Sequence, residues 1–379
     1  MNSDYLDIAG RIAARLCRDA LWSRGRCNWT ADFFDAGRVA HGALGPSLYE
    51  GTSGIALFLS RMASVTGERI FRLTAEAALR QAFEKLAAAG SGVYSGALGI
   101  HYVAADMDQT LDQDALIRQA TPDPSQLDVI SGSAGAIAML LLARRRTQNA
   151  LFLEAAIQHG DLLLAEASRE ERGWSWRTIE GTANLTGFSH GAAGIAWALA
   201  ELFAVTHEVR FRSAAMEAFR YERSCWNPEE RNWPDFRGDE PAYPVLWCHG
   251  AGGIGFSRLR AWQIFGDEEL RAEAVTALQI VRGHIGSLRN YSLCHGEMGN
   301  ADLLLYASQV LGDDTWLAGA QAAAREGAER FEHRRVPWPC GLAGVNETPG
   351  LMLGLAGIGH FYLRLADPSR TPTVLLPAC

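Results

Sequence analysis

A short glycine motif recurs seven times along the 379-residue chain. Each copy ends in a glycine and has a second glycine three residues later, and the first glycines lie 36 to 59 residues apart. This interval leaves room for one pair of helices per copy, and a repeat spread over most of the chain predicts one stacked or closed body. The first glycines are Gly51, Gly96, Gly132, Gly191, Gly250, Gly296 and Gly354, and the second ones are Gly54, Gly99, Gly135, Gly194, Gly253, Gly299 and Gly357.

Two kinds of helical pattern alternate between the motifs. Amphipathic segments, with apolar residues three and four apart and charges on the other face, predict outer helices. Much more apolar runs follow most of the second glycines and predict buried inner helices, each with its first glycine at or near the helix N-terminus. The expected outer helices span residues 69–89, 150–167, 209–225, 268–285 and 315–334.

The alternation predicts an all-α fold, an α/α toroid with about seven inner and seven outer helices. All seven motifs would then face one end of the barrel. There is little strand pattern, and proline and glycine gather in expected loops at 227–244 and 336–349. We therefore expect a single domain over residues 1–379.

Composition excludes several classes of partner and location. The net charge of −8 is mild and the Lys and Arg residues are scattered, which makes nucleic acid and anionic membrane poor partners. No signal-peptide pattern or long apolar run is present, so we expect a cytoplasmic protein. The seven cysteines are an odd and scattered set, unlike a disulfide framework. They are Cys17, Cys27, Cys225, Cys248, Cys294, Cys340 and Cys379.

Three copies of the motif carry side chains suited to metal chemistry. Two of them read Cys-His-Gly, with Cys248 and His249 in one and Cys294 and His295 in the other, and a third keeps only His190. A helix N-terminus favours thiolate. Cys294 and His295 can reach one ion from an extended turn, and Cys248 would complete three ligands with an open fourth position, as in catalytic zinc sites. The alternative is buried cysteines and satisfied histidines, but two equivalent Cys-His pairs favour zinc.

The remaining polar residues of these motifs have two interpretations each. His190 and His249 share the position of His295 and so suit acid/base catalysis or orientation of the site, although either could be a cap or a core residue. His190 is the stronger candidate because no adjacent cysteine explains it. Asp128 could reach the same rim or cap a helix. The loop 232–237 either contacts substrate or is a turn packed by its aromatics. We assign the other cysteines and histidines to the core or surface.

The motif at 187–195, together with Trp-Cys-His-Gly at 247–250 and Leu-Cys-His-Gly at 293–296, resembles the lanthipeptide (lantibiotic) cyclase family, the LanC-like proteins. The likeness is greatest to the C-terminal cyclase domain of class II lanthipeptide synthetases. It extends over nearly the whole chain, since residues 48–59, 128–135, 232–235 and 349–368 also fit.

The resemblance implies an α/α toroid holding one zinc ion through Cys248, Cys294 and His295. The family adds cysteine thiols of a dehydrated precursor peptide to dehydroalanine or dehydrobutyrine, which forms lanthionine or methyllanthionine thioether rings. His190 matches the position proposed for acid/base work, and Asp128 resembles another polar position near the zinc.

Two departures from the family pattern affect these expectations. The dehydratase domain of class II synthetases has no counterpart here, so we expect a stand-alone cyclase or an excised domain, with a separate dehydratase as a candidate partner. Some members have an arginine shortly before the first zinc cysteine and a tyrosine after it, where this chain has Pro244 and His249. The alternatives are addition of glutathione to dehydrated residues, as in some LanC-like proteins, and a non-catalytic zinc-containing module that binds a peptide.

Overall fold

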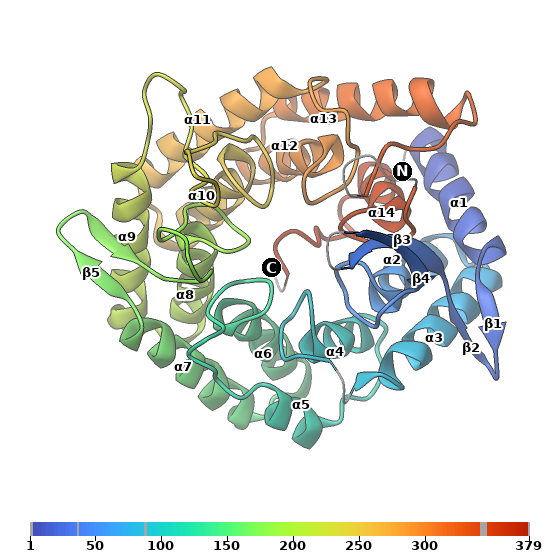
Figure 1. The fold of residues 1–379 in the computed structure, drawn as a ribbon, viewed down its shortest axis with the longest axis horizontal. Coiled ribbons are helices and arrows are strands. Elements are labelled where there is room, and N and C mark those ends of the chain that lie inside the picture. Colours follow the sequence, from blue (N-terminus) through green and yellow to red (C-terminus); the bar gives the residue numbers. More distant parts are fainter. Residues whose placement is uncertain (1–2, 36–37, 87–88, 342–346, 378–379) are drawn as a thin grey trace.

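A closed ring of helices forms the body of the protein (Figure 1). The computed structural model describes residues 3–35, 38–86, 89–341 and 347–377. Within these residues seven inner helices follow one another around the ring, each packed on the next, and the last packs on the first. They are α2 (Thr52–Thr66), α4 (Ala97–Asp106), α6 (Ser133–Thr147), α8 (Ala192–Thr206), α10 (Ala251–Phe265), α12 (Glu297–Leu311) and α14 (Leu355–Ala366).

Seven outer helices of the described chain surround this ring, so the predicted α/α toroid is confirmed. Each packs mainly on one inner helix, and α1 packs mainly on α14, which makes the two ends of the chain the seventh pair. The outer helices are α1 (Ser3–Arg18), α3 (Arg69–Phe83), α5 (Gln113–Gln119), α7 (Ala150–Ala165), α9 (Val209–Ser224), α11 (Glu268–His284) and α13 (Asp314–Gly327), the last continued by a π-helix at Ala328–Glu332.

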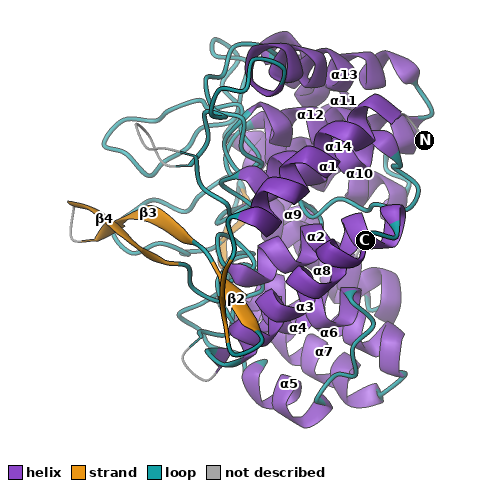
Figure 2. Cartoon of the chain, turned by 90° about the vertical axis from the view of Figure 1, so that its right-hand side faces the viewer, coloured by secondary structure: helices purple, strands orange, loops and turns teal. Residues whose placement is uncertain are grey.

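The structure adds short strands to the expected all-helical pattern. There are three two-stranded antiparallel hairpins in the described residues, and their strands are too short to show a clear alternation in the sequence. Figure 2 shows β3 and β4 projecting on the side where the loops gather. The hairpins pair β1 (Leu21–Ser23) with β2 (Arg26–Asn28), β3 (Thr30–Asp35) with β4 (Arg38–Ala43), and β5 (Ser168–Glu170) with β6 (Gly173–Ser175).

The segment after α14 enters the barrel interior. It turns into the centre of the ring (Figure 1), where Trp247 donates to the Leu375 carbonyl at 3.1 Å and Tyr94 to that of Val374 at 2.6 Å. Arg364 of α14 pairs with Asp302 of α12 at 2.5 Å, and both are 2% exposed. The segment therefore packs beneath the motif residues Trp247 and Tyr94.

The first glycine of every motif directly precedes an inner helix, as predicted. At six of the seven the backbone is extended, with φ between −99° and −146°, so the reason for glycine is the close approach of neighbouring backbone. Gly250 is different, because its φ is +78° and a Cβ there would lie 1.7 Å from the Pro244 carbonyl oxygen.

Gly250→Ala is therefore expected to lower the free energy of unfolding by more than about 3 kcal/mol, since backbone strain and a clash add together. Gly266→Ala is the matched control, because its φ is +65° but no atom lies within 4 Å of the added Cβ. It should lose only about 1 kcal/mol. Urea unfolding of both variants measures the difference, and equal losses would contradict this account of Gly250.

Candidate functional site

All seven glycine motifs contribute to one cavity at the open end of the barrel. It has a volume of about 510 Å³. Cys248, Cys294, His295, His190 and His249 all line it, so the structure brings together five of the six residues singled out in the sequence. The other lining residues are Ser47, Tyr49, Glu50, Ser95, Ile130, Ser189, Arg237, Leu246 and Leu353.

A closed circle of backbone hydrogen bonds holds the motifs side by side. Each motif donates at least one N–H to a carbonyl of its neighbour, at 2.7 to 3.3 Å, and the seventh motif donates back to the first. The circle fixes the residues before each first glycine around the barrel axis, which is why side chains far apart in sequence meet there. From donor to acceptor the bonds run Tyr49 to Tyr94, Tyr94 to Ile130, Val129 to Ser189, Ser189 to Cys248, Cys248 to Cys294, Cys294 to Met352 and Met352 to Tyr49.

Cys248 and Cys294 are neighbours in this circle, and their thiols interact directly. The Cys294 thiol donates to the sulfur of Cys248, which lowers the pKa of Cys248 and raises that of Cys294. The Cys294 sulfur also accepts a hydrogen bond from the Tyr49 hydroxyl at 2.8 Å. Two neighbouring thiols, one buried and one half-buried, are a suitable pair of ligands for a soft cation.

His295 lies in the same cavity, and a hydrogen bond to a backbone carbonyl orients its ring. Its Nε2–H donates to the Gly341 carbonyl at 3.1 Å, so Nδ1 is the nitrogen left to bind a metal. A backbone carbonyl behind the ring is the usual way in which a metal-binding histidine is oriented. As the side chains stand, however, the described residues contain no group of three His, Cys, Asp or Glu arranged to hold a metal ion. The donor set thus fits zinc by its chemistry, and zinc binding stays a prediction.

His190 forms a pair with Asp128, the sixth residue singled out in the sequence. Its Nδ1–H donates to Asp128 Oδ2 at 2.5 Å, which leaves Nε2 free to act on a substrate. The other oxygen of Asp128 accepts the Ser131 N–H at 2.8 Å, so this residue both caps a turn and orients the histidine. The His190 side chain is 26% exposed and so remains accessible from the cavity.

His249 is far more enclosed, with 1% of its side chain exposed. Its Nδ1 lies 3.7 Å from Asp235 Oδ1, and its ring stacks beside that of His190 with centroids 6.0 Å apart. Burial lowers the pKa of His249 to about 3, and the nearby charge of Arg237 adds to this effect. The ring is therefore neutral near physiological pH, which suits a hydrogen-bonding role better than acid catalysis.

The loop 232–237 does reach the cavity rim, through Arg237. The guanidinium of Arg237 forms a bidentate pair with Asp235, with Nη2 and Oδ2 2.7 Å apart. Asn232 instead binds backbone groups, including the Pro244 carbonyl at 2.9 Å, and shapes the loop. The sequence predicted a possible role for the loop but not for Arg237 in particular, and it did not predict Tyr49. The available signal for Tyr49 was a tyrosine in the first motif.

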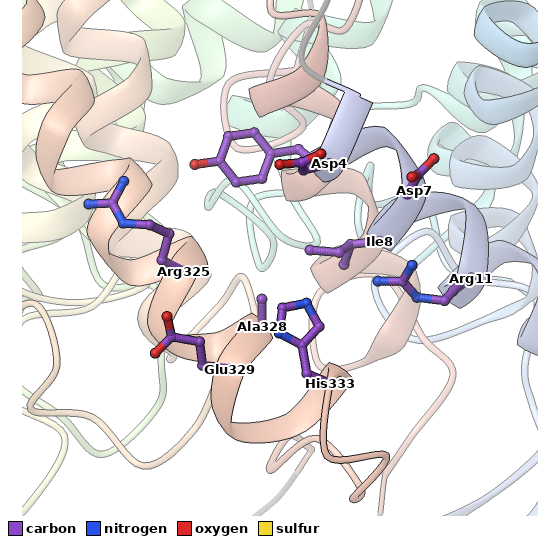
Figure 3. Close-up of a pocket in the computed structure, with 9 residues that line it drawn as sticks. Asp4, Asp7, Ile8, Arg11, Arg325, Ala328, Glu329 and His333 are labelled. Atoms are coloured by element: carbon purple, nitrogen blue, oxygen red, sulfur yellow. The ribbon is translucent and has the colours of Figure 1, made fainter.

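The other described cysteines lie outside this site, as expected. Cys17, Cys27, Cys225 and Cys340 are free thiols that do not line the cavity, and Cys379 lies outside the described residues. A separate cavity of about 330 Å³ lies between α1 and the π-helix and is lined by no cysteine. Figure 3 shows residues that line it, among them Asp4, Arg325 and His333. A search of the described helices finds none with the length and hydropathy required to span a bilayer.

The fold and the cavity define a class of protein, an α/α toroid whose open end presents paired thiols beside a His–Asp pair. A family model described as lanthionine synthetase C-like protein matches residues 42–376, and the chain belongs to that family.

The chain is similar to proteins from a bacterium and from an animal. The chain is 26% identical over 285 residues to the lacticin 481/lactococcin biosynthesis protein LcnDR2 of Lactococcus lactis subsp. lactis, covering 69% of this chain but 28% of that protein. It is 23% identical over 348 residues to glutathione S-transferase LANCL1 of Danio rerio, covering 85% and 82% of the two chains. Nisin cyclase has the same fold, with a TM-score of 0.71, 16% identity, and coverage of 98% of this chain and 96% of that one.

Proposed function

We propose that this chain is a zinc-dependent lanthipeptide cyclase, which adds cysteine thiols of a precursor peptide to dehydroalanine or dehydrobutyrine and forms thioether rings. The observation that carries the proposal is the backbone circle, because it gathers Cys248, Cys294 and His295 beside the His190–Asp128 pair in one open cavity. The dehydrated peptide would come from a dehydratase, either a separate partner or another part of a longer chain. A cytoplasmic location stays a prediction.

Zinc is the metal that this donor set fits. Two thiols and an imidazole are soft and borderline donors, and three protein ligands leave a position for a substrate sulfur. When bound, zinc would lower the pKa of the substrate thiol, so that the thiol is ionised at neutral pH. Cys248 Sγ, Cys294 Sγ and His295 Nδ1 are the atoms proposed to hold it.

The chain's own residues account for the rest of the addition. As the sulfur bonds to the β-carbon, the carbon–carbon double bond opens and negative charge moves to the carbonyl oxygen of the dehydro residue. Arg237, at the cavity wall, is placed to stabilise that charge. His190 Nε2, which carries no proton while Nδ1–H is bound to Asp128, would take the proton of the substrate thiol and then give it to the α-carbon. Asp128 holds Nδ1 and so orients the ring.

The charges in the cavity favour a peptide over glutathione as the thiol donor. Glutathione addition deserves comparison because one relative is named a glutathione S-transferase. A tripeptide with two carboxylates would call for a cluster of basic side chains. Among the described residues that line the cavity, Arg237 is the one Lys or Arg, it is already paired with Asp235, and Glu50 adds a negative charge.

Thiol counting by mass spectrometry tests the proposal. Zinc-loaded protein is incubated with a dehydrated, cysteine-containing precursor peptide, with and without glutathione, and the remaining thiols are alkylated. Cyclisation is expected to leave the peptide mass unchanged and to remove alkylatable thiols, in either condition. A peptide that gains the mass of glutathione while its own thiols stay free would instead support the glutathione reaction.

Removal of zinc distinguishes a catalytic site from a zinc-stabilised binding module. The ring of helices is held by a large apolar core, so chelation is expected to lower the melting temperature by no more than about 5 °C and to leave the helical circular dichroism unchanged. A module that depends on zinc for its fold would melt on chelation. Loss of helical signal in the chelated protein would therefore favour the binding-module alternative.

A further inference from the structure

We propose that Tyr49 is a positioning residue of this site, whose hydroxyl donates a hydrogen bond to the Cys294 sulfur and tunes it as a metal ligand. The inference rests on the proposed function and extends it to a motif that carries neither cysteine nor histidine. The geometric basis is the 2.8 Å separation of Tyr49 Oη and Cys294 Sγ inside the cavity. The two residues are 245 positions apart in the chain, so the contact is a product of the closed ring.

The backbone circle fixes the tyrosine relative to the cysteine. The Tyr49 carbonyl accepts the Met352 N–H at 2.7 Å, and the Met352 carbonyl accepts the Cys294 N–H at 2.9 Å. On its other side, the Tyr49 N–H donates to the Tyr94 carbonyl at 2.9 Å, and the two tyrosine rings meet edge to face with centroids 6.4 Å apart. The hydroxyl is therefore presented to the sulfur by a rigid support.

A hydroxyl bound to a ligand sulfur has a definite chemical consequence. Two thiolates donate so much charge to a zinc ion that its power to acidify a third thiol falls. A hydrogen bond withdraws electron density from one of the two thiolates, so the ion can still lower the pKa of the substrate thiol. It also makes the Cys294 sulfur a weaker nucleophile, which directs the addition to the substrate sulfur rather than to the protein.

Cobalt(II) in place of zinc gives a readout that does not depend on turnover. Tyr49→Phe keeps the ring but removes the hydroxyl, so its sulfur-to-cobalt charge-transfer band is expected at lower energy than in wild type. Its zinc affinity should fall about 10- to 100-fold. The acidic limb of its pH–rate profile should move to higher pH. Wild-type protein grown with 3-fluorotyrosine, a stronger donor, should show the opposite shift of the band.

Tyr94→Phe is the matched control, because its hydroxyl donates to the Val374 carbonyl at 2.6 Å and not to the sulfur. Its cobalt spectrum should equal that of wild type. A Tyr49→Phe protein with the wild-type spectrum and zinc affinity would overturn the role of Tyr49 alone, with the metal site intact. Wild-type protein that binds neither cobalt nor zinc would overturn both this role and the proposed metal site.

Discussion

Replacing Cys294 by alanine is expected to abolish stoichiometric zinc binding and to slow thioether formation by at least about 100-fold. The variant loses one of three ligands and leaves both Tyr49 Oη and the Cys248 thiol without the sulfur they contact. A free substrate thiol, with a pKa near 8.5, is only a few per cent ionised at neutral pH and would no longer be held beside its acceptor. Elemental analysis of the purified protein and thiol counting on the dehydrated peptide measure the two losses.

Cys225→Ala provides the control for this experiment. Cys225 is a half-buried free thiol at the end of α9 and does not line the cavity. This variant should bind zinc and close rings as wild type does. A Cys294→Ala protein that still holds one zinc per chain and cyclises at the wild-type rate would remove Cys294 from the site.

His190→Ala is expected to retain zinc but to slow ring closure by about 10²- to 10⁴-fold, because the proton for the α-carbon then has no positioned donor. Water would deliver that proton to either face, so the variant should also yield a mixture of configurations at the new α-carbon. Chiral analysis of the hydrolysed lanthionine measures this mixture. Asp128→Asn should show the same effects in weaker form, since the ring loses its carboxylate partner but keeps its place.

An exposed histidine serves as the control here. His284, in the last turn of α11, donates from Nδ1 to the Ile280 carbonyl and does not line the cavity. His284→Ala should keep both the rate and the single configuration. If His190→Ala also kept both, the proton donor would have to be another group in the cavity.

The ring architecture could be predicted because the packing requires a glycine at the same position of every repeat. Each first glycine precedes an inner helix, and a side chain there would strike the neighbouring backbone. The closure of the ring was harder to foresee. The seventh outer helix, α1, comes from the start of the chain and pairs with α14 from its end. The spacing between neighbouring motifs therefore does not predict this pair.

The candidate site could be predicted where chemistry and repeat position coincide, as for Cys248, Cys294 and His295. Residues outside the Cys-His pattern were harder to predict. The loop 232–237 was a candidate for substrate contact, but its sequence did not indicate that Arg237 is the residue that lines the cavity. Tyr49, which the hydrogen-bonded circle brings to the cavity, was not predicted. Asp128 had two interpretations from sequence, as cap and as site residue, and the structure has both, because its two oxygens serve different partners.

Titration of metal-free protein with zinc tests the central claim most directly. The chelated protein is given increasing zinc, and the rate of thiol loss from the dehydrated peptide is followed. The account predicts that thioether formation is absent without metal, rises with added zinc and saturates at one ion per chain. Ring closure at an undiminished rate in the metal-free protein would contradict it.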